Sequence, residues 1–203
     1  MKFLTLILIL FLSAIAEAQT TNAPSHFDPN DNELRARILD EEIRPLLKVE
    51  TVDWKALEKQ FATKYGANIA RRLISRAKPI FHLQEKDWKK TQKSLSRHIE
   101  KYGTDDVGAY KLNEYSWTFF ENTSNKKLLK EAAKWSLKSI ELEKDAAEYL
   151  DTYANVLYRL GKTQEAIEWQ EKGLVVAKEE PLKRILQNAL DKMRKGEPTW
   201  PTK

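Results

Sequence analysis

The sequence contains no cysteine among its 203 residues. This absence excludes disulfides, thiolate metal sites, cysteine nucleophiles and thiol redox chemistry. Glycine and proline are also scarce, with 6 and 7 residues, which is little turn-forming material for a protein of many short strands. Charged residues make up 32% of the chain and hydrophobic residues 41%, a balance typical of a folded chain. The composition therefore favours a globular, helical protein.

Sequence motifs of common enzyme chemistry are missing as well. The chain has no HExxH, no GxSxG and no glycine-rich phosphate loop. His26, His82 and His98 form no i, i+4 pair and have no carboxylate at ligand spacing. We therefore expect no catalytic, cofactor-binding or metal-binding residues. All-α cell-wall lytic enzymes that work with a single glutamate stay open as an alternative.

The first 18 residues have the layout of a secretory signal peptide. Lys2 is positive, residues 3–15 are an apolar run, and residues 16–18 (Ala-Glu-Ala) match the small-x-small pattern that signal peptidase cuts. A membrane-spanning helix needs about 20 apolar residues, so we expect cleavage after Ala18 and a mature start at Gln19. A retained anchor is the alternative, and a lipoprotein is excluded because no cysteine can carry the lipid. We expect an exported protein, periplasmic in a bacterium or secreted, with no membrane span after cleavage.

The balance of charge is mildly basic, with 35 lysines and arginines against 30 aspartates and glutamates. Basic and acidic residues are interleaved along nearly every segment, as in residues 126–145, and this pattern is typical of solvated helix faces. We therefore expect no nucleic-acid partner. Contact with anionic cell-surface material is an alternative.

Apolar residues recur with helical spacing from residue 33 to residue 195. In the clearest stretch, which Gly161 closes, one helix face carries Leu150, Tyr153, Ala154, Leu157 and Tyr158. No window of four or more residues alternates as a strand requires. The sequence therefore predicts an all-α domain over residues 33–195, with a flexible lead-in (19–32) and a tail (196–203).

An internal repeat includes this clearest helix. In AEYLDTYANVLYRLGKTQEAIEWQEKGLVVAK, Gly161 takes the position of a turn glycine, and Ala166 that of the small residue at which paired helices cross. This unit, at about residues 147–180, resembles a tetratricopeptide repeat, a helix–turn–helix unit of 34 residues. It departs from the family pattern at Gln170, where a large apolar residue is usual, and at Gly173, which replaces a second alanine.

Two further helix pairs precede this unit. The one at about residues 109–144 fits the same frame, with Ala132 at the small position and a four-residue insertion around the NTSN segment. A weaker pair lies at about residues 67–102. The resemblance implies antiparallel helix pairs stacked as a short tetratricopeptide-like α-solenoid.

The LNEYSW and YLDTYANVLYRLGK segments carry a second resemblance. Around them, residues 54–178 are similar to the helical region that follows the thioredoxin-like domain in some exported bacterial proteins. This chain has no thioredoxin domain and no CxxC motif, so the redox role of such proteins is not implied. The resemblance implies the helical module alone.

A tetratricopeptide stack binds partners along the groove lined by the first helix of each pair. The matching positions in this chain are Asn113, Trp117, Phe120, Asp151, Asn155, Tyr158 and Arg159. Asparagine can pair with a peptide backbone, Arg159 suits a carboxylate, and aromatic rings offer flat apolar area. The two-cation carboxylate clamp is not reproduced, because Asp151 stands where a lysine is required. The alternative is that these positions serve mainly in packing and on the surface.

Six tryptophans are many for a chain of this length. They suit sugar stacking, but at helical spacing we interpret them as packing between repeats. Trp200, between two prolines in the tail, is the one without an obvious core partner.

The function that these patterns predict is an exported interaction module or scaffold that binds a peptide or protein partner in the cell envelope. A structural accessory subunit that packs through its helix faces, without a peptide groove, is the competing interpretation. A helical cell-wall-acting enzyme is the third. The sequence identifies neither the partner nor the oligomeric state.

Overall fold

The structure is a computed structural model that describes residues 31–202. Regular structure in this part of the chain is helical and no strand occurs, so the prediction of an all-α fold is confirmed. The predicted signal peptide, with its cleavage site after Ala18, and the predicted lead-in up to residue 30 lie outside the described residues. Within residues 31–202, no helix has the length and apolar character needed to cross a membrane.

The described chain begins with a helical segment whose pitch changes twice. It comprises α2 (Asn32–Ile38), a π-helical turn η1 (Leu39–Ile43) and a 3₁₀ turn η2 (Arg44–Leu47). The Asp31 carboxylate caps α2 by accepting the Leu34 N–H at 2.9 Å. The sequence predicted a kink or an end at Pro45. The α-helical geometry already stops at Ile38, and Pro45 lies inside the closing 3₁₀ turn, after which the helical segment ends at Leu47.

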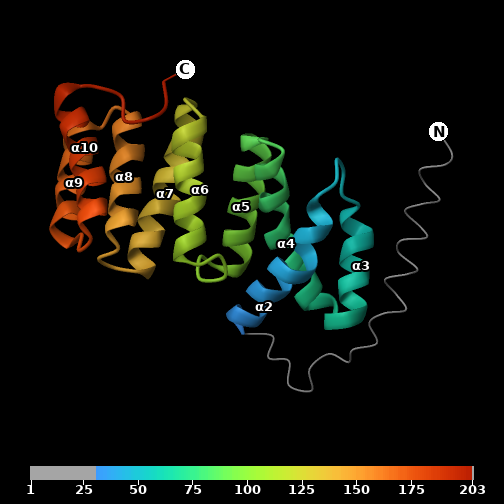
Figure 1. Ribbon diagram of the computed structural model, residues 1–203. Helices are drawn as coiled ribbons and strands as arrows, with labels where there is room; N and C mark the ends of the chain where they lie inside the picture. Colours follow the sequence, from blue (N-terminus) through green and yellow to red (C-terminus); the bar gives the residue numbers. More distant parts are fainter. Residues whose placement is uncertain (1–30, 203) are drawn as a thin grey trace.

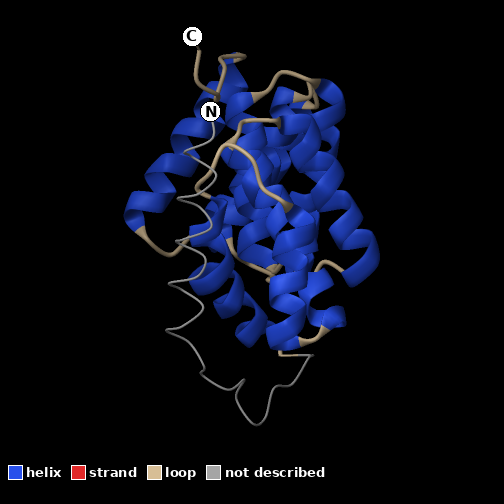
Figure 2. Cartoon of the chain, turned by 90° about the vertical axis from the view of Figure 1, so that its right-hand side faces the viewer, coloured by secondary structure: helices blue, strands red, loops and turns tan. Residues whose placement is uncertain are grey.

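Longer helices follow, most of them in antiparallel pairs. Their bounds are α3 Trp54–Tyr65, α4 Ala67–Gln84, α5 Trp88–Tyr102, α6 Ala109–Asn122, α7 Lys126–Leu142, α8 Ala147–Arg159, α9 Thr163–Val176 and α10 Glu180–Lys195. Helix α4 packs on α5, α6 on α7, and α8 on both α9 and α6, while α10 packs on α9. The helices therefore stand side by side in chain order (Figure 1), and the view turned by 90° shows helices throughout the described part (Figure 2). This is a solenoid-like stack.

Small residues let the paired helices approach closely. Ala132 on α7 is fully buried, and the Ser116 hydroxyl on α6 donates to its carbonyl at 3.0 Å. On α9, a Cβ added to Gly173 would lie 3.1 Å from Leu186 of α10 and 3.5 Å from Leu150 of α8. These contacts fix the spacing of α6 against α7 and of α9 against its two neighbours.

Each of the six tryptophans contacts another aromatic ring of the chain. The ring pairs are Trp54–Phe81, Trp88–Phe119, Trp117–Phe120, Trp135–Tyr115, Trp169–Tyr153 and Trp200–Tyr158. Most join neighbouring helices, and Trp200 does have a partner, on α8. Trp54, Trp88, Trp135 and Trp169 therefore pack between helices, whereas Trp117 contacts a ring of its own helix and Trp200 joins the tail to α8.

Candidate functional site

The predicted groove residues lie on two neighbouring helices, as expected for the first helices of two pairs. Helix α6 carries Asn113, Trp117 and Phe120, and α8 carries the other four. The structure does not bring all seven together. Three lie in a cluster at the carboxyl ends of α6 and α8, two in a buried network between α8, α9 and α10, and two further along α6.

The first location is an aromatic and cationic cluster formed by Phe120, Tyr158 and Arg159, which we call the end cluster. Arg159 donates from Nη1 to the Phe120 carbonyl, in the last turn of α6. Its guanidinium lies 5.8 Å from the centroid of the Phe120 ring. A cation is favoured here because the last carbonyls of a helix lack intrahelical partners. Burial lowers the pKa of Arg159.

The tail of the chain covers the end cluster. Gly196 adopts the left-handed conformation (φ 73°) after α10, and the Glu197 N–H closes the turn on the Lys192 carbonyl at 2.9 Å. The chain then turns back over the end of α8 (Figure 1). The Tyr158 hydroxyl donates to the Glu197 carbonyl at 3.0 Å. The Trp200 ring centroid lies 5.8 Å from that of Tyr158 and 5.1 Å from the Arg159 guanidinium.

Two groove residues continue the same helix face along α6. Trp117 is half-buried and its ring lies 4.9 Å from that of Phe120. Asn113 stands one turn earlier on α6, and its buried Oδ1 has no hydrogen-bond partner in the described chain. This face therefore combines aromatic surface with an amide oxygen that the described residues leave unsatisfied.

Asp151 and Asn155 lie in the second location, away from the tail. Asp151 is 7% exposed and Asn155 2%. The Asp151 carboxylate accepts from Asn155 Nδ2 at 3.0 Å and from Gln170 Nε2 at 2.6 Å, and Gln170 Nε2 also donates to the Leu186 carbonyl at 3.1 Å. Burial raises the pKa of Asp151 to about 6, although both hydrogen bonds act to lower it. In this conformation these two side chains join three helices and face no open surface.

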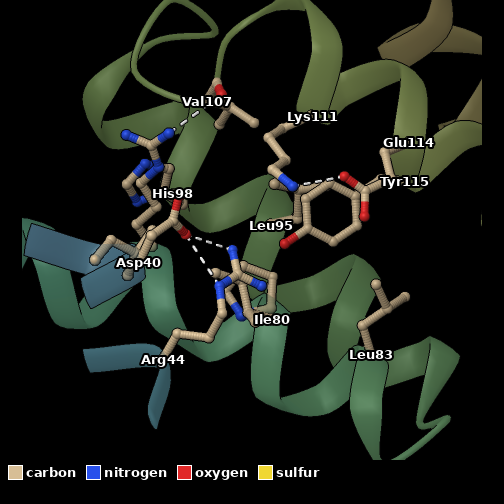
Figure 3. Close-up of a pocket in the computed structure, with 13 residues that line it drawn as sticks. Asp40, Arg44, Ile80, Leu83, Leu95, His98, Val107, Lys111, Glu114 and Tyr115 are labelled. Atoms are coloured by element: carbon tan, nitrogen blue, oxygen red, sulfur yellow. Dashed lines mark hydrogen bonds and ion pairs between the residues drawn. The ribbon is translucent and has the colours of Figure 1, made fainter. Parts of the chain in front are cut away.

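A pocket that the sequence did not predict lies between η1, α4, α5 and α6 (Figure 3). Its walls combine apolar side chains with charged ones. The lining residues are Leu39, Asp40, Arg44, Arg76, Pro79, Ile80, Leu83, Leu95, His98, Val107, Lys111, Glu114 and Tyr115. They come from segments up to 76 positions apart (Leu39 and Tyr115), so no local motif could have indicated the pocket.

A buried charge cluster borders this pocket, centred on Asp106 in the loop between α5 and α6. Asp106 is 2% exposed and pairs with Arg35 at 3.0 Å, Arg72 at 2.8 Å and His98 Nε2 at 2.8 Å. Burial alone would raise the pKa of Asp106, but the hydrogen bonds from His98 and Arg72 and their charges hold that pKa well below its usual value. The cluster ties α2, α4 and α5 to one carboxylate.

The same cluster contains a chain of serine, histidine and aspartate side chains. The other ring nitrogen of His98, Nδ1, lies 3.1 Å from the Ser75 hydroxyl. Ser75 stands in the interior of α4, where the neighbouring backbone N–H groups are used in the helix ladder and leave no donors for an oxyanion. Asp106 is already shared with two arginines. The arrangement therefore orders the interior and lacks the parts that nucleophilic catalysis requires.

The sequence pattern predicted the residues of the end cluster but neither the contact with the tail nor the pocket. The only signals for the Asp106 cluster were a histidine eight positions before the aspartate and two glycines, one three positions before it and one two positions after it. Among residues 31–202, no group of three or more His, Asp or Glu side chains could hold a metal ion. Comparison with protein-family models and with curated proteins gave no match to the chain.

Proposed function

We propose that this chain is a protein-interaction module that binds an extended segment at the end cluster, where its own residues 197–201 lie. One observation carries the proposal: Trp200 is seated against Tyr158 and Arg159. An intramolecular occupant of this kind supports the idea that the surface accepts extended chain with an aromatic side chain. The predicted tetratricopeptide-like character and the predicted export, with a mature start at Gln19, place such binding in the cell envelope in this proposal.

The chemistry of the end cluster defines the segment that it would accept. A planar guanidinium and two aromatic rings favour an aromatic side chain, through stacking and cation–π attraction. The Tyr158 hydroxyl donates to a backbone carbonyl, and this contact is independent of the partner's sequence. Pro198 and Pro201 flank Trp200, and proline lowers the entropy cost of holding a peptide extended. The partner would therefore present an aromatic residue beside proline.

A peptide selection tests this function. The bait is the chain from Gln19 to Gly196, which lacks the tail, and the library displays random peptides. We expect enrichment of peptides with an aromatic residue next to proline, and we expect the chain that ends at Lys203 to bind them more weakly because its own tail competes. Arg159→Ala should abolish their capture, whereas Arg97→Ala, which removes an exposed cation on α5, should not. Enriched peptides that bind the Arg159→Ala bait equally well would contradict the proposal.

A second function, packing against a larger assembly through helix faces, is favoured by two exposed apolar side chains. Val175 near the end of α9 is 84% exposed, and Ile185 near the start of α10 is 61% exposed. Exposed apolar residues on the last pair of a stack suit an added helical neighbour. Val175→Lys with Ile185→Lys should then abolish co-purification with the assembly and leave peptide capture unchanged. Retained co-purification would remove this candidate.

A further inference from the structure

The pocket between η1, α4, α5 and α6 has the size of a small ligand. Its cavity volume is about 50 Å³. On this measure a single water needs about 10–15 Å³, so the cavity has room for roughly three to five non-hydrogen atoms. A drug-sized molecule or a peptide side chain with its backbone does not fit.

The shape of the pocket follows from two irregular helical segments. The π-helical turn η1 presents Leu39 and Asp40 to the cavity, and such turns displace side chains from the positions that an α-helix would give them. Pro79 lies inside α4 and also lines the cavity. The helix continues through Pro79, but proline cannot donate to the carbonyl four residues earlier, so one hydrogen bond of the helix is missing there. Both irregular positions therefore border the cavity.

The charges that line the pocket leave one cation without a carboxylate. Arg44 pairs with Asp40 at 2.6 Å, and Lys111 pairs with Glu114 at 2.7 Å (Figure 3). Arg76 has no carboxylate within ion-pair distance in the described residues. Among residues 31–202, its guanidinium donates only to the Val107 carbonyl, at 3.4 Å.

The environment of Arg76 is costly for a charge. The side chain is half-buried, and burial lowers its pKa, although the negative charge of Asp106 acts in the opposite direction. A charge removed from water is stabilised best by a directly bonded opposite charge, and the described residues give Arg76 only the long hydrogen bond to the Val107 carbonyl. An anion in the pocket would supply that partner.

Tyr115 provides a second polar group. Its ring is buried and its hydroxyl makes no hydrogen bond within the described chain, while the side chain lines the cavity (Figure 3). A neutral phenol donates one hydrogen bond, and burial raises the pKa of Tyr115 above its ordinary value, which keeps the proton in place. The remaining wall near it is aliphatic, with Ile80, Leu83 and Leu95.

We propose that this pocket binds a small aliphatic monocarboxylate of three to five non-hydrogen atoms, whose carboxylate accepts from Arg76 and Tyr115 and whose alkyl end contacts Ile80, Leu83 and Leu95. A monoanion matches the single unpaired guanidinium. Phosphate and sulfate carry more charge and no apolar end, so they would leave a second buried charge and the aliphatic wall uncovered. This site is separate from the end cluster, and the inference does not depend on the proposed peptide binding.

Isothermal titration of the chain from Gln19 with acetate and propionate, at low ionic strength, tests the inference. We expect saturable binding of both, and none of acetamide or propionamide, which keep the shape without the charge. Hexanoate should bind at least tenfold more weakly because it exceeds the cavity. No saturable binding of either short acid, equal binding of the amides, or tighter binding of phosphate or sulfate would each overturn the proposal.

Three variants separate the site from general effects. Arg76→Gln should weaken propionate binding by about 10–100-fold, the range expected for a lost hydrogen bond to a charged group. Tyr115→Phe keeps the ring and should also weaken binding by about 10–100-fold, because the lost hydrogen bond is to the same charged carboxylate. Arg71→Gln, at an exposed arginine of the same helix, is the matched control and should change nothing. Propionate binding that survives both pocket substitutions would overturn the proposal, and thermal unfolding curves verify that each variant is folded.

Discussion

The Asp106 carboxylate joins three helices of the amino-terminal half of the fold, α2, α4 and α5. It accepts from side chains on three helices, although Arg35 is 71 positions away in the sequence. Gly103 and Gly108 (φ 85° and 84°) begin and end the loop that carries it, and in this region of backbone conformation residues with a Cβ are strained. The charge of Asp106, its burial and the geometry of its loop therefore all indicate that this aspartate holds the three helices together.

Asp106→Asn should destabilise the protein strongly. The substitution removes the negative charge and leaves two arginines near a neutral amide, and breaking a buried ion pair costs about 3–5 kcal/mol. The measurement is the free energy of unfolding from urea denaturation at neutral pH. The control is Asp145→Asn, at an exposed residue with φ 65° that asparagine adopts readily, which should change stability by less than about 0.5 kcal/mol. Equal effects of the two substitutions would show that the cluster is not a stabilising tie.

Asp151 should give the stability of the protein a pH dependence of the opposite sign to that of Asp106. Its pKa is raised to about 6 in the fold, against about 3.9 in an unfolded chain. Between these values the native state holds a proton that the unfolded state has lost, so stability falls as the pH rises from about 4 to about 6 and is then constant. For Asp106, whose pKa is lowered, stability is instead lost as the pH falls below about 4.

Asp151→Asn should remove the fall in stability between about pH 4 and about pH 6 that Asp151 causes. The amide oxygen can still accept from Asn155 and Gln170, and no buried charge forms at neutral pH. The stability of the variant relative to the unsubstituted chain should therefore rise by about 1–3 kcal/mol between about pH 4 and pH 7. Urea denaturation at several pH values measures this difference in the free energy of unfolding. The contribution of Asp106 is the same in both chains and cancels. A difference that does not change with pH would contradict the assignment.

Helix pairing depends on small residues where two helices cross. At the crossing of α6 and α7, Ala132 is fully buried and Ser116 bonds to its carbonyl. Ala132→Leu should separate the two helices and cost about 1–3 kcal/mol, as overpacking of a close contact does. Ala67→Leu, at an exposed alanine in the first turn of α4, is the matched control and should change the melting temperature little. A small effect at both positions would argue against close packing at Ala132.

The tail should stabilise the packing of α8 and should compete with an added peptide for the end cluster. Trp200→Ala removes one aromatic contact and one cation–π contact, so we expect a loss of about 1–3 kcal/mol in the free energy of unfolding. The same variant should bind an added peptide more tightly than the unsubstituted chain does. Thr202→Ala, at an exposed residue of the tail, is the control and should change neither the free energy of unfolding nor the affinity for the peptide. Unchanged stability and unchanged peptide binding would contradict the role of Trp200.

Across the chain, local sequence patterns predicted the helices. The contacts between helices were not predictable in the same way, because they join residues that lie far apart in the sequence. Helices α8 and α9 were predictable because apolar spacing and the turn at Gly161 are properties of neighbouring residues. The resemblance to a tetratricopeptide repeat predicted Asp151 and Asn155 in a groove, but their burial depends on Gln170 and on the position of α10. The contact of Trp200 with Arg159 and the convergence of charges on Asp106 arise only when the helices are stacked.

We propose that the end cluster binds an extended aromatic segment and that the tail is its intramolecular occupant. The most direct test is fluorescence anisotropy of a labelled peptide with the sequence of residues 197–203, titrated with the chain from Gln19 to Gly196. We predict saturable binding that weakens at least tenfold with Arg159→Ala, and weaker binding by the chain that keeps its tail, because a tethered competitor acts at an effective concentration of about millimolar. No saturable binding, or equal affinity of the chains with and without the tail, would contradict the account.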